Sequence, residues 1–129
     1  MANLEKFQKQ NYLNLETFRK TGEGVKTPVW FVEFKDQLCF TTEPQSGKVK
    51  RMRRNPQVRV APCKMDGTLL GDWSPATIRF LQKEEAQAVD KLYKQKYGPM
   101  LFFFDLAKIF NKKPERTFIA ISLDSPSEA

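Results

Sequence analysis

A short basic segment, residues 46–56, interrupts a chain that otherwise alternates between apolar and polar positions. Strand-like alternation ends near residue 42 before the segment and resumes at 57–63 after it, so a helix is inserted between two β-strands. Five cations stand within seven residues of this insert: Lys48, Lys50, Arg51, Arg53 and Arg54. A Ser-Gly pair precedes them. Unpaired N–H groups and the helix dipole at such a start favour a phosphate or another compact anion.

Local signals set the limits of this helix. Ser46 suits the N-cap, because its hydroxyl can accept a hydrogen bond from the first turn. Val49 and Met52 stand three residues apart and predict one packed face. Pro56 ends the helix, since proline disfavours helical geometry in the residue before it. We therefore predict a helix between Ser46 and Pro56 with its cations on the exposed side.

Composition indicates that the positive charge is local. The chain of 129 residues suits a single domain, residues 1–129, with 1–10 and 124–129 peripheral or frayed. Without the five cations of the basic segment, the formal net charge of +7 would fall to +2. Most of the excess charge thus belongs to one element, which favours a localised anion site over a uniformly basic surface.

Periodicity predicts a mainly β protein with α-helices, a small and partly open barrel of about six strands. A short helix or turn at 4–8 comes first, and a helix from residue 83 ends at Gly98-Pro99. A further helical segment runs from about 101 to 111. The expected strands are 12–18, 25–34, 37–42, 57–63, one from the turn at 64–67 through residue 80, and 116–123.

The residue types exclude several chemistries. The chain has no histidine, so His-based triads, most zinc sites and imidazole acid–base catalysis are absent. Cys39 and Cys63 lie in apolar runs, are expected as buried thiols, and form no metal site. No nucleotide-binding glycine loop occurs.

The N-terminus has no apolar signal core and the most apolar run is too short for a membrane span, so we expect a soluble, cytoplasmic protein.

Several motifs in a fixed order resemble one known family. They are Thr27-Pro28-Val29-Trp30-Phe31-Val32, Thr41-Thr42 with the basic segment, Val60-Ala61-Pro62-Cys63 and Asp66-Gly67. This set resembles the flavin- and deazaflavin-binding split barrels related to pyridoxamine 5'-phosphate oxidase, especially the short deazaflavin-dependent oxidoreductases. The resemblance covers residues 12–123. It implies a six-stranded antiparallel split β-barrel with short inserted helices, and a homodimer with a cofactor cleft at the interface.

The resemblance also implies the cofactor and its contacts. The family binds FMN or the deazaflavin coenzyme F-420, and acts on small-molecule substrates by hydride transfer. By position, Lys48 binds the cofactor phosphate, with Arg51 as a further anion contact. The other implied cofactor-binding residues are Ser46, Gly47, Thr42, Thr27, Pro28, Val29 and Trp30. Backbone groups of Thr27, Pro28 and Val29 would line the ring, whereas Trp30 suits the core equally well. No catalytic acid or base is identified.

Departures from the family pattern argue against one of the family's reactions. Pyridoxamine phosphate oxidases carry an arginine where this chain has Gly47, and they use a C-terminal Arg-x-His pattern that this chain cannot supply. Oxidation of pyridoxamine phosphate is therefore not expected. Two alternatives stay open: a flavin carrier without turnover, and a basic barrel that binds single-stranded nucleic acid. The second is weaker, because the aromatic residues fall in strands that look buried.

Overall fold

The computed structural model describes residues 4–101 and 116–124. A short 3-10 helix, η1, precedes seven strands and two α-helices. Their bounds are η1 Glu5–Phe7, β1 Tyr12–Phe18, β2 Gly24–Trp30, β3 Val32–Phe34, β4 Gln37–Thr42, α1 Gly47–Arg54, β5 Gln57–Cys63, β6 Ser74–Phe80, α2 Lys83–Leu101 and β7 Thr117–Leu123. Most of the predicted second helical segment, from residue 102 on, lies outside the described residues, as do residues 1–3 and 125–129.

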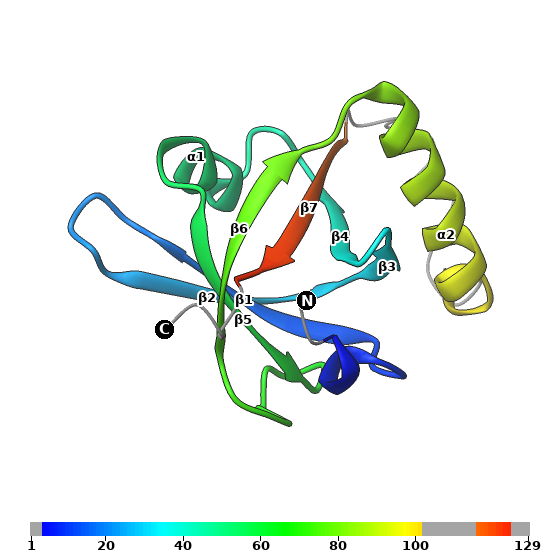
Figure 1. Ribbon diagram of the computed structural model, residues 1–129, viewed down its shortest axis with the longest axis horizontal. Helices are drawn as coiled ribbons and strands as arrows, with labels where there is room; N and C mark the ends of the chain where they lie inside the picture. Colours follow the sequence, from blue (N-terminus) through cyan, green and yellow to red (C-terminus); the bar gives the residue numbers. More distant parts are fainter. Residues whose placement is uncertain (1–3, 102–115, 125–129) are drawn as a thin grey trace.

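The strands form one curled antiparallel sheet in the order β2-β1-β5-β6-β7-β4-β3 (Figure 1). The predicted class, a mainly β protein with an antiparallel half-barrel and inserted helices, is confirmed. The predicted number of strands was wrong, since the sheet has seven and not six. The long strand expected to lead from residues 64–67 to Phe80 is also shorter, because regular pairing begins only at Ser74.

The additional strand arises at Phe31. The apolar run 25–34 was expected as one strand, but its first part pairs with β1 and its last part pairs with β4. These two partners lie toward opposite ends of the strand order. The run therefore leaves one sheet edge and joins the other, and Phe31 sits at the seam between the two edges. Lys35 and Asp36, with φ of 51° and 61°, then make the tight turn into β4.

The core fills the inside of the curled sheet. Val49 and Met52 of α1 are buried there as predicted, and they close one end of the half-barrel. Within the N-terminal segment predicted to be peripheral, Leu4 and Phe7 are buried in the same core. The remaining buried members are Leu13, Leu15, Phe31, Leu38, Phe40, Val58, Val60, Ala76, Ile78, Ile119 and Ile121.

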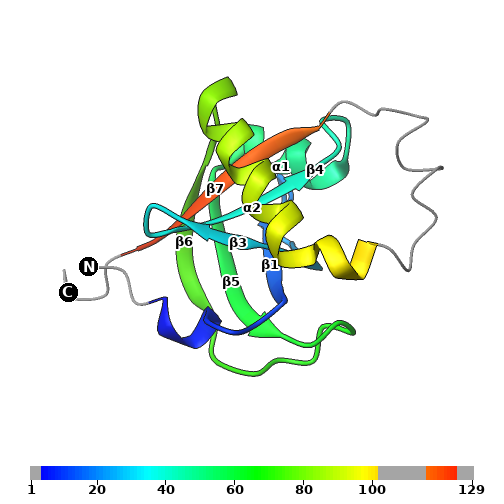
Figure 2. The same ribbon diagram turned by 90° about the vertical axis from the view of Figure 1, so that its right-hand side faces the viewer.

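Helix α2 covers the seam at the other side of the sheet from α1 (Figures 1 and 2). The Tyr97 hydroxyl accepts a hydrogen bond from the Phe31 N–H at 3.0 Å and lies 2.6 Å from the Phe31 carbonyl oxygen. The Tyr93 hydroxyl donates to the carbonyl of Trp30. Side chains of α2 thus satisfy backbone groups at the point where the chain changes sheet edge.

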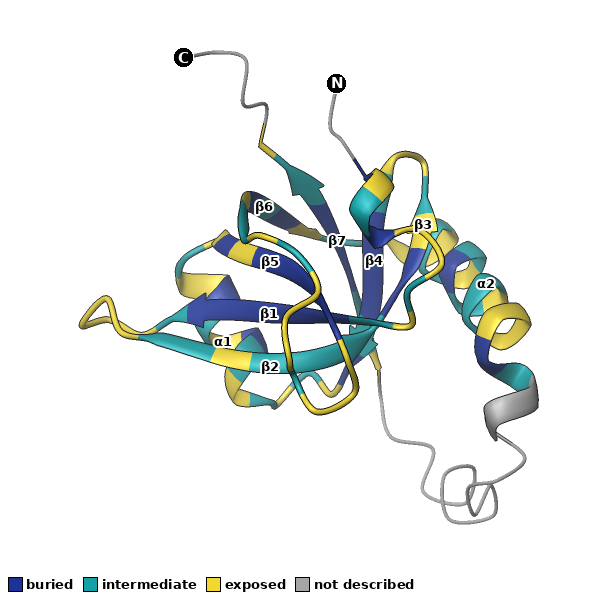
Figure 3. Cartoon of the chain, turned by 90° about the horizontal axis from the view of Figure 1, so that it is seen from below, coloured by how far each residue is buried: buried dark blue, intermediate teal, exposed yellow. Residues whose placement is uncertain are grey.

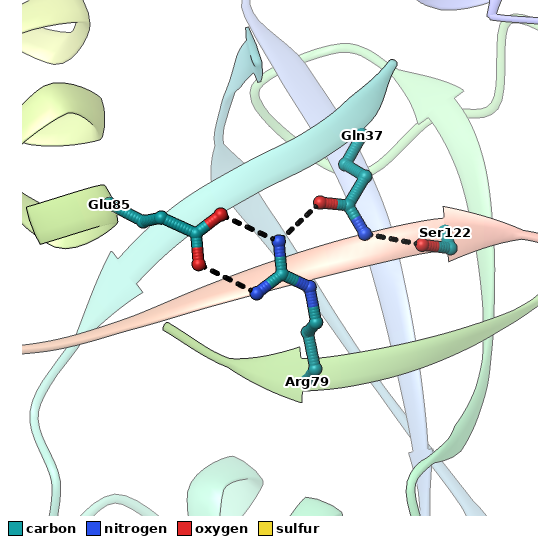
Figure 4. Close-up of polar contacts among 4 residues, drawn as sticks. All are labelled: Gln37, Arg79, Glu85 and Ser122. Carbon is teal, nitrogen blue, oxygen red and sulfur yellow. Dashed lines mark hydrogen bonds and ion pairs between the residues drawn. The ribbon is translucent and has the colours of Figure 1, made fainter. Parts of the chain in front are cut away.

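A second contact fixes the beginning of α2. Arg79 of β6 makes two hydrogen bonds to the Glu85 carboxylate, at 2.8 and 2.9 Å, and a third to the Gln37 side chain (Figure 4). Gln37 donates in turn to the Ser122 hydroxyl. This network joins α2 to three neighbouring strands. The helix continues to Leu101, so the predicted end at Gly98-Pro99 was wrong.

No helix in the described part of the chain is both long and apolar enough to cross a membrane.

Candidate anion and cofactor site

The first turn of α1 leaves two backbone donors available. Ser46 is the N-cap, as predicted, and its hydroxyl accepts a hydrogen bond from the Val49 N–H at 3.4 Å. The N–H groups of Gly47 and Lys48 have no hydrogen-bond partner among the described residues. No acidic residue stands in this turn. The helix start therefore presents unpaired N–H groups and the positive end of the dipole.

Lys48 is the centre of a group of cations. Its side chain is half-buried, and burial lowers the pKa of its ammonium group. Arg51 and then Arg116 lower this pKa further, whereas Glu43 acts against them. Charges that lower the pKa of a lysine by repulsion must lie close to it, and they favour an anion that would relieve the repulsion. Lys48, Arg51 and Arg116 thus form one positive region.

The structure brings the end of β4 to this region. Thr42, an implied contact, is buried at the last position of β4 and pairs with Thr117 of β7. The guanidinium of Arg116 donates to the Thr41 carbonyl at 3.4 Å, which holds Arg116 at the same end of the sheet. Arg116 could not be predicted from local patterns, because its neighbour Thr41 is 75 residues away in the chain.

Arg51 turns back across the helix start. Its Nε donates to the Thr17 hydroxyl of β1 at 2.6 Å. Burial lowers the pKa of its guanidinium, and the charges of Arg19 and Arg54 lower it further. Thr17 was not among the predicted site residues, and nothing in the alternation of β1 distinguishes it from an ordinary core threonine.

The outer arginines of α1 have other contacts. Arg54 donates to the Phe18 carbonyl at 3.2 Å. The Arg53 guanidinium lies 5.4 Å from the centre of the Phe80 ring. These contacts engage both guanidinium groups with residues other than the implied cofactor contacts.

The implied ring-lining residues follow β2 away from α1. Thr27 and Val29 pair with Leu15 and Leu13 of β1, while Pro28 faces Asn14 on the opposite side of the sheet. At the far end of β2, Trp30 stacks on Tyr97 of α2, with ring centres 4.5 Å apart and planes at 4°. Within one chain, the structure therefore brings Trp30 to α2 and does not place it beside Lys48.

The connection between β5 and β6 covers the outer face of β1 and β2 (Figure 3). Asn14 donates from Nδ2 to the Gly67 carbonyl at 3.2 Å, and a Cβ on Gly67 would lie 3.5 Å from the Pro28 ring. The Oδ1 atom of Asn14 is buried without a hydrogen-bond partner in the described structure. Asn14, too, was not predicted from the sequence.

Trp73 lies on the same outer face, between two cations. Its ring is 5.5 Å from the Lys26 Nζ and 5.2 Å from the Arg59 guanidinium carbon. Arg59 also donates from Nε to the buried Glu16 carboxylate at 2.6 Å. These contacts hold Trp73 over β2 and β5 within one chain.

The described residues offer little chemistry of their own. No group of His, Cys, Asp and Glu side chains among them is placed to hold a metal ion. Burial raises the pKa of the Cys39 thiol to about 12 and also raises that of Cys63, so both thiols stay protonated at neutral pH. The site described above can bind an anion, but it contains no evident nucleophile or acid–base pair.

Comparison with known proteins identifies the fold. No protein-family model matches the chain, and no curated protein matches it in sequence. Among solved structures, HutZ, the heme storage protein from Vibrio cholerae, has a TM-score of 0.69 at 12% identity, covering 94% of this chain and 87% of that one. A proposed pyridoxamine 5'-phosphate oxidase from Listeria innocua has a TM-score of 0.64 at 11% identity, covering 95% and 90%.

A FAD-binding protein from Mesorhizobium loti has the same architecture, with a TM-score of 0.63 at 15% identity, covering 97% of this chain and 90% of that one. At such identities the likeness establishes the fold and leaves the activity open. The chain thus has the fold of the split barrels related to pyridoxamine 5'-phosphate oxidase, and the resemblance seen in the sequence is confirmed at that level.

Proposed function

We propose that this chain binds the phosphate of a flavin-type cofactor, FMN or the deazaflavin coenzyme F-420, at the first turn of α1. The observation that carries the proposal is the donor set there: two unpaired backbone N–H groups and the neighbouring cations of Lys48 and Arg51. A phosphate group is the ligand that such a set suits best, because it accepts several hydrogen bonds and neutralises the crowded positive charge.

The residues present fit such a group. A Cβ at Gly47 would lie 3.0 Å from a guanidinium nitrogen of Arg51, so the absence of a side chain at Gly47 lets the guanidinium lie against the first turn. Lys48 supplies a point charge and Arg51 a planar pair of donors. By position, the backbone of Thr27, Pro28 and Val29 would line the ring along β2.

A bound flavin or deazaflavin ring supplies hydride transfer, and the function we propose is that of an oxidoreductase acting on a small molecule. The chain's own part is to hold the phosphate, orient the ring along β2 and exclude water from it. We further propose that a second copy of the chain completes the cleft, because Trp30 and α2 lie away from α1 within one subunit. A carrier that holds the same cofactor without turnover would use the same anchor.

Heme storage, the role for which HutZ is named, is less well supported here. Heme is commonly held by an axial histidine, and this chain has none. Both cysteines are buried. Nucleic-acid binding is also less well supported, because Trp30 is already stacked on Tyr97 and cannot serve as a free platform for bases.

The test is a fluorescence titration of the purified protein with FMN and with coenzyme F-420, comparing Lys48→Ala with Lys50→Ala. Lys50 is an exposed cation of the same helix, so it controls for net charge. We expect Lys48→Ala to weaken binding roughly ten- to a hundredfold, the usual range for a hydrogen bond to a charged group. Lys50→Ala should change the affinity less than about threefold, since exposed charges contribute little.

Equal losses in the two variants would show non-specific charge attraction and contradict the anchor. Binding to neither cofactor, together with tight and salt-dependent binding of single-stranded DNA, would replace the proposal with the nucleic-acid-binding function.

A further inference from the structure

The position of Arg51 is fixed from two sides. On one side, its Nε donates to the hydroxyl of Thr17 at 2.6 Å. Thr17 is only 1% exposed and belongs to β1, so this acceptor is held by the sheet and cannot follow a moving side chain. On the other side, the guanidinium rests over Gly47. The point where a Gly47 Cβ would stand is 3.0 Å from Nη1, 3.7 Å from Cζ and 3.8 Å from Nη2.

These two contacts leave the two terminal nitrogens of the guanidinium, Nη1 and Nη2, available as hydrogen-bond donors. Thr17 uses the Nε–H, and the structure gives neither Nη1 nor Nη2 a hydrogen-bond partner among the residues that it describes. Both nitrogens lie above the first turn, where the N–H groups of Gly47 and Lys48 are also unpaired. A guanidinium binds phosphate best through two parallel N–H donors, and a fixed orientation lowers the entropy lost when they bind.

We propose that Thr17 is a positioning residue for the anion site: through its hydrogen bond to Nε, and with Gly47 beneath the guanidinium, it holds Arg51 so that Nη1 and Nη2 face the cofactor phosphate. The inference rests on the proposed function and adds a specificity element to it. A threonine buried in β1 thereby distinguishes ligands that carry a phosphate from those that lack one, without touching either.

The test compares FMN with riboflavin, which has the same ring and no phosphate. We expect Thr17→Val, which keeps the shape of the side chain and removes the acceptor, to weaken FMN binding roughly three- to tenfold, close to one ordinary hydrogen bond. Riboflavin affinity should stay within about twofold, and Thr17→Ser should restore FMN binding. Gly47→Ala should act in the same direction as Thr17→Val, because the added methyl group displaces the guanidinium.

A double-mutant cycle separates positioning from a general loss of structure. In an Arg51→Ala background, Thr17→Val should have no further effect on FMN affinity, since the residue acts through Arg51. Equal weakening of FMN and riboflavin by Thr17→Val, or the same loss with and without Arg51, would overturn the positioning role while leaving the anchor intact. If the unmodified protein binds FMN no better than riboflavin, the phosphate anchor itself is wrong and the positioning role falls with it.

Discussion

Lys96 of α2 places a positive charge against the seam. Its Nζ donates to the carbonyls of Gln10 and Phe31, both at 2.8 Å, and lies 4.0 Å from the centre of the Phe31 ring. Burial lowers the pKa of this lysine to about 8, and the charge of Glu33 offsets part of the effect. The charged form of Lys96 is therefore less stable in the folded protein than in the unfolded chain, which costs free energy of folding at neutral pH.

This cost predicts a pH dependence of stability. Because the pKa of Lys96 is lower in the folded chain, the unfolded chain binds more protons between pH 8 and 10.5, and the contribution of Lys96 to the free energy of unfolding rises across that window. The difference in unfolding free energy between the natural protein and Lys96→Met isolates this group. It should rise by about 1 kcal/mol, less than the full shift implies, because the side chain is partly in solvent. Urea titrations from pH 7 to 10.5 measure it, and a flat or falling difference would contradict the lowered pKa.

At the scale of single residues, local patterns were predictable and distant contacts were not. The N-cap at Ser46 and the buried pair Val49 and Met52 follow from spacing within one helix, and all three were confirmed. The contact between Arg51 and Thr17 joins residues 34 positions apart. No pattern within either segment encodes such a pair, since only the packing of α1 on β1 brings the two side chains together.

At the scale of elements, two of the errors concern where an element ends. Gly98-Pro99 is a common helix end, and the apolar run 25–34 has the composition of a single strand, so propensity favoured both predictions. The observed ends of both elements differ from these predictions, and tertiary contacts are found at both places. Tyr97, immediately before Gly98, is buried on the sheet, and its hydroxyl accepts from the Phe31 N–H at the seam between β2 and β3. Propensity is a weak preference that such packing overrides.

The Tyr97 hydroxyl should therefore contribute measurably to the stability of α2 on the sheet. We expect Tyr97→Phe to lower the free energy of unfolding by about 1–3 kcal/mol, because the buried N–H of Phe31 loses its acceptor. Denaturant titration measures the loss, and hydrogen exchange at Phe31 should accelerate. Tyr12→Phe is the matched control, since the Tyr12 hydroxyl has no hydrogen bond among the described residues. Equal effects in both variants would contradict the role of Tyr97.

At the scale of the whole molecule, hairpins were predictable and strand order was not. The pairs β1–β2 and β3–β4 are joined by short turns, which alternation and turn residues indicate. The pairs β1–β5 and β4–β7 join distant segments. Only the three-dimensional structure identifies these pairs, since no local pattern links segments so far apart in the chain. Prediction of the site has the same limit, because Thr17 of β1 and Arg116, just before β7, are distant from α1 in the chain.

The proposed cleft between two subunits predicts the state of the molecule in solution. Sedimentation equilibrium should give a mass of about twice the 15.0 kDa of the chain. The dimer should persist at the protein concentrations at which FMN binds with one cofactor per chain. A monomer that binds FMN with unchanged affinity on dilution would contradict a cleft shared between subunits and place the whole site in one chain.

Strand β7 lies between β6 and β4, so it joins two groups of strands that are otherwise not neighbours in the sheet. It is also the last of the seven to be synthesised. A nascent chain that has not yet reached residue 123 therefore carries two partial sheets, and the facing edges of β4 and β6 both have unpaired backbone groups. Chaperones that shield strand edges would matter most in this interval, since productive closure competes there with pairing between neighbouring nascent chains.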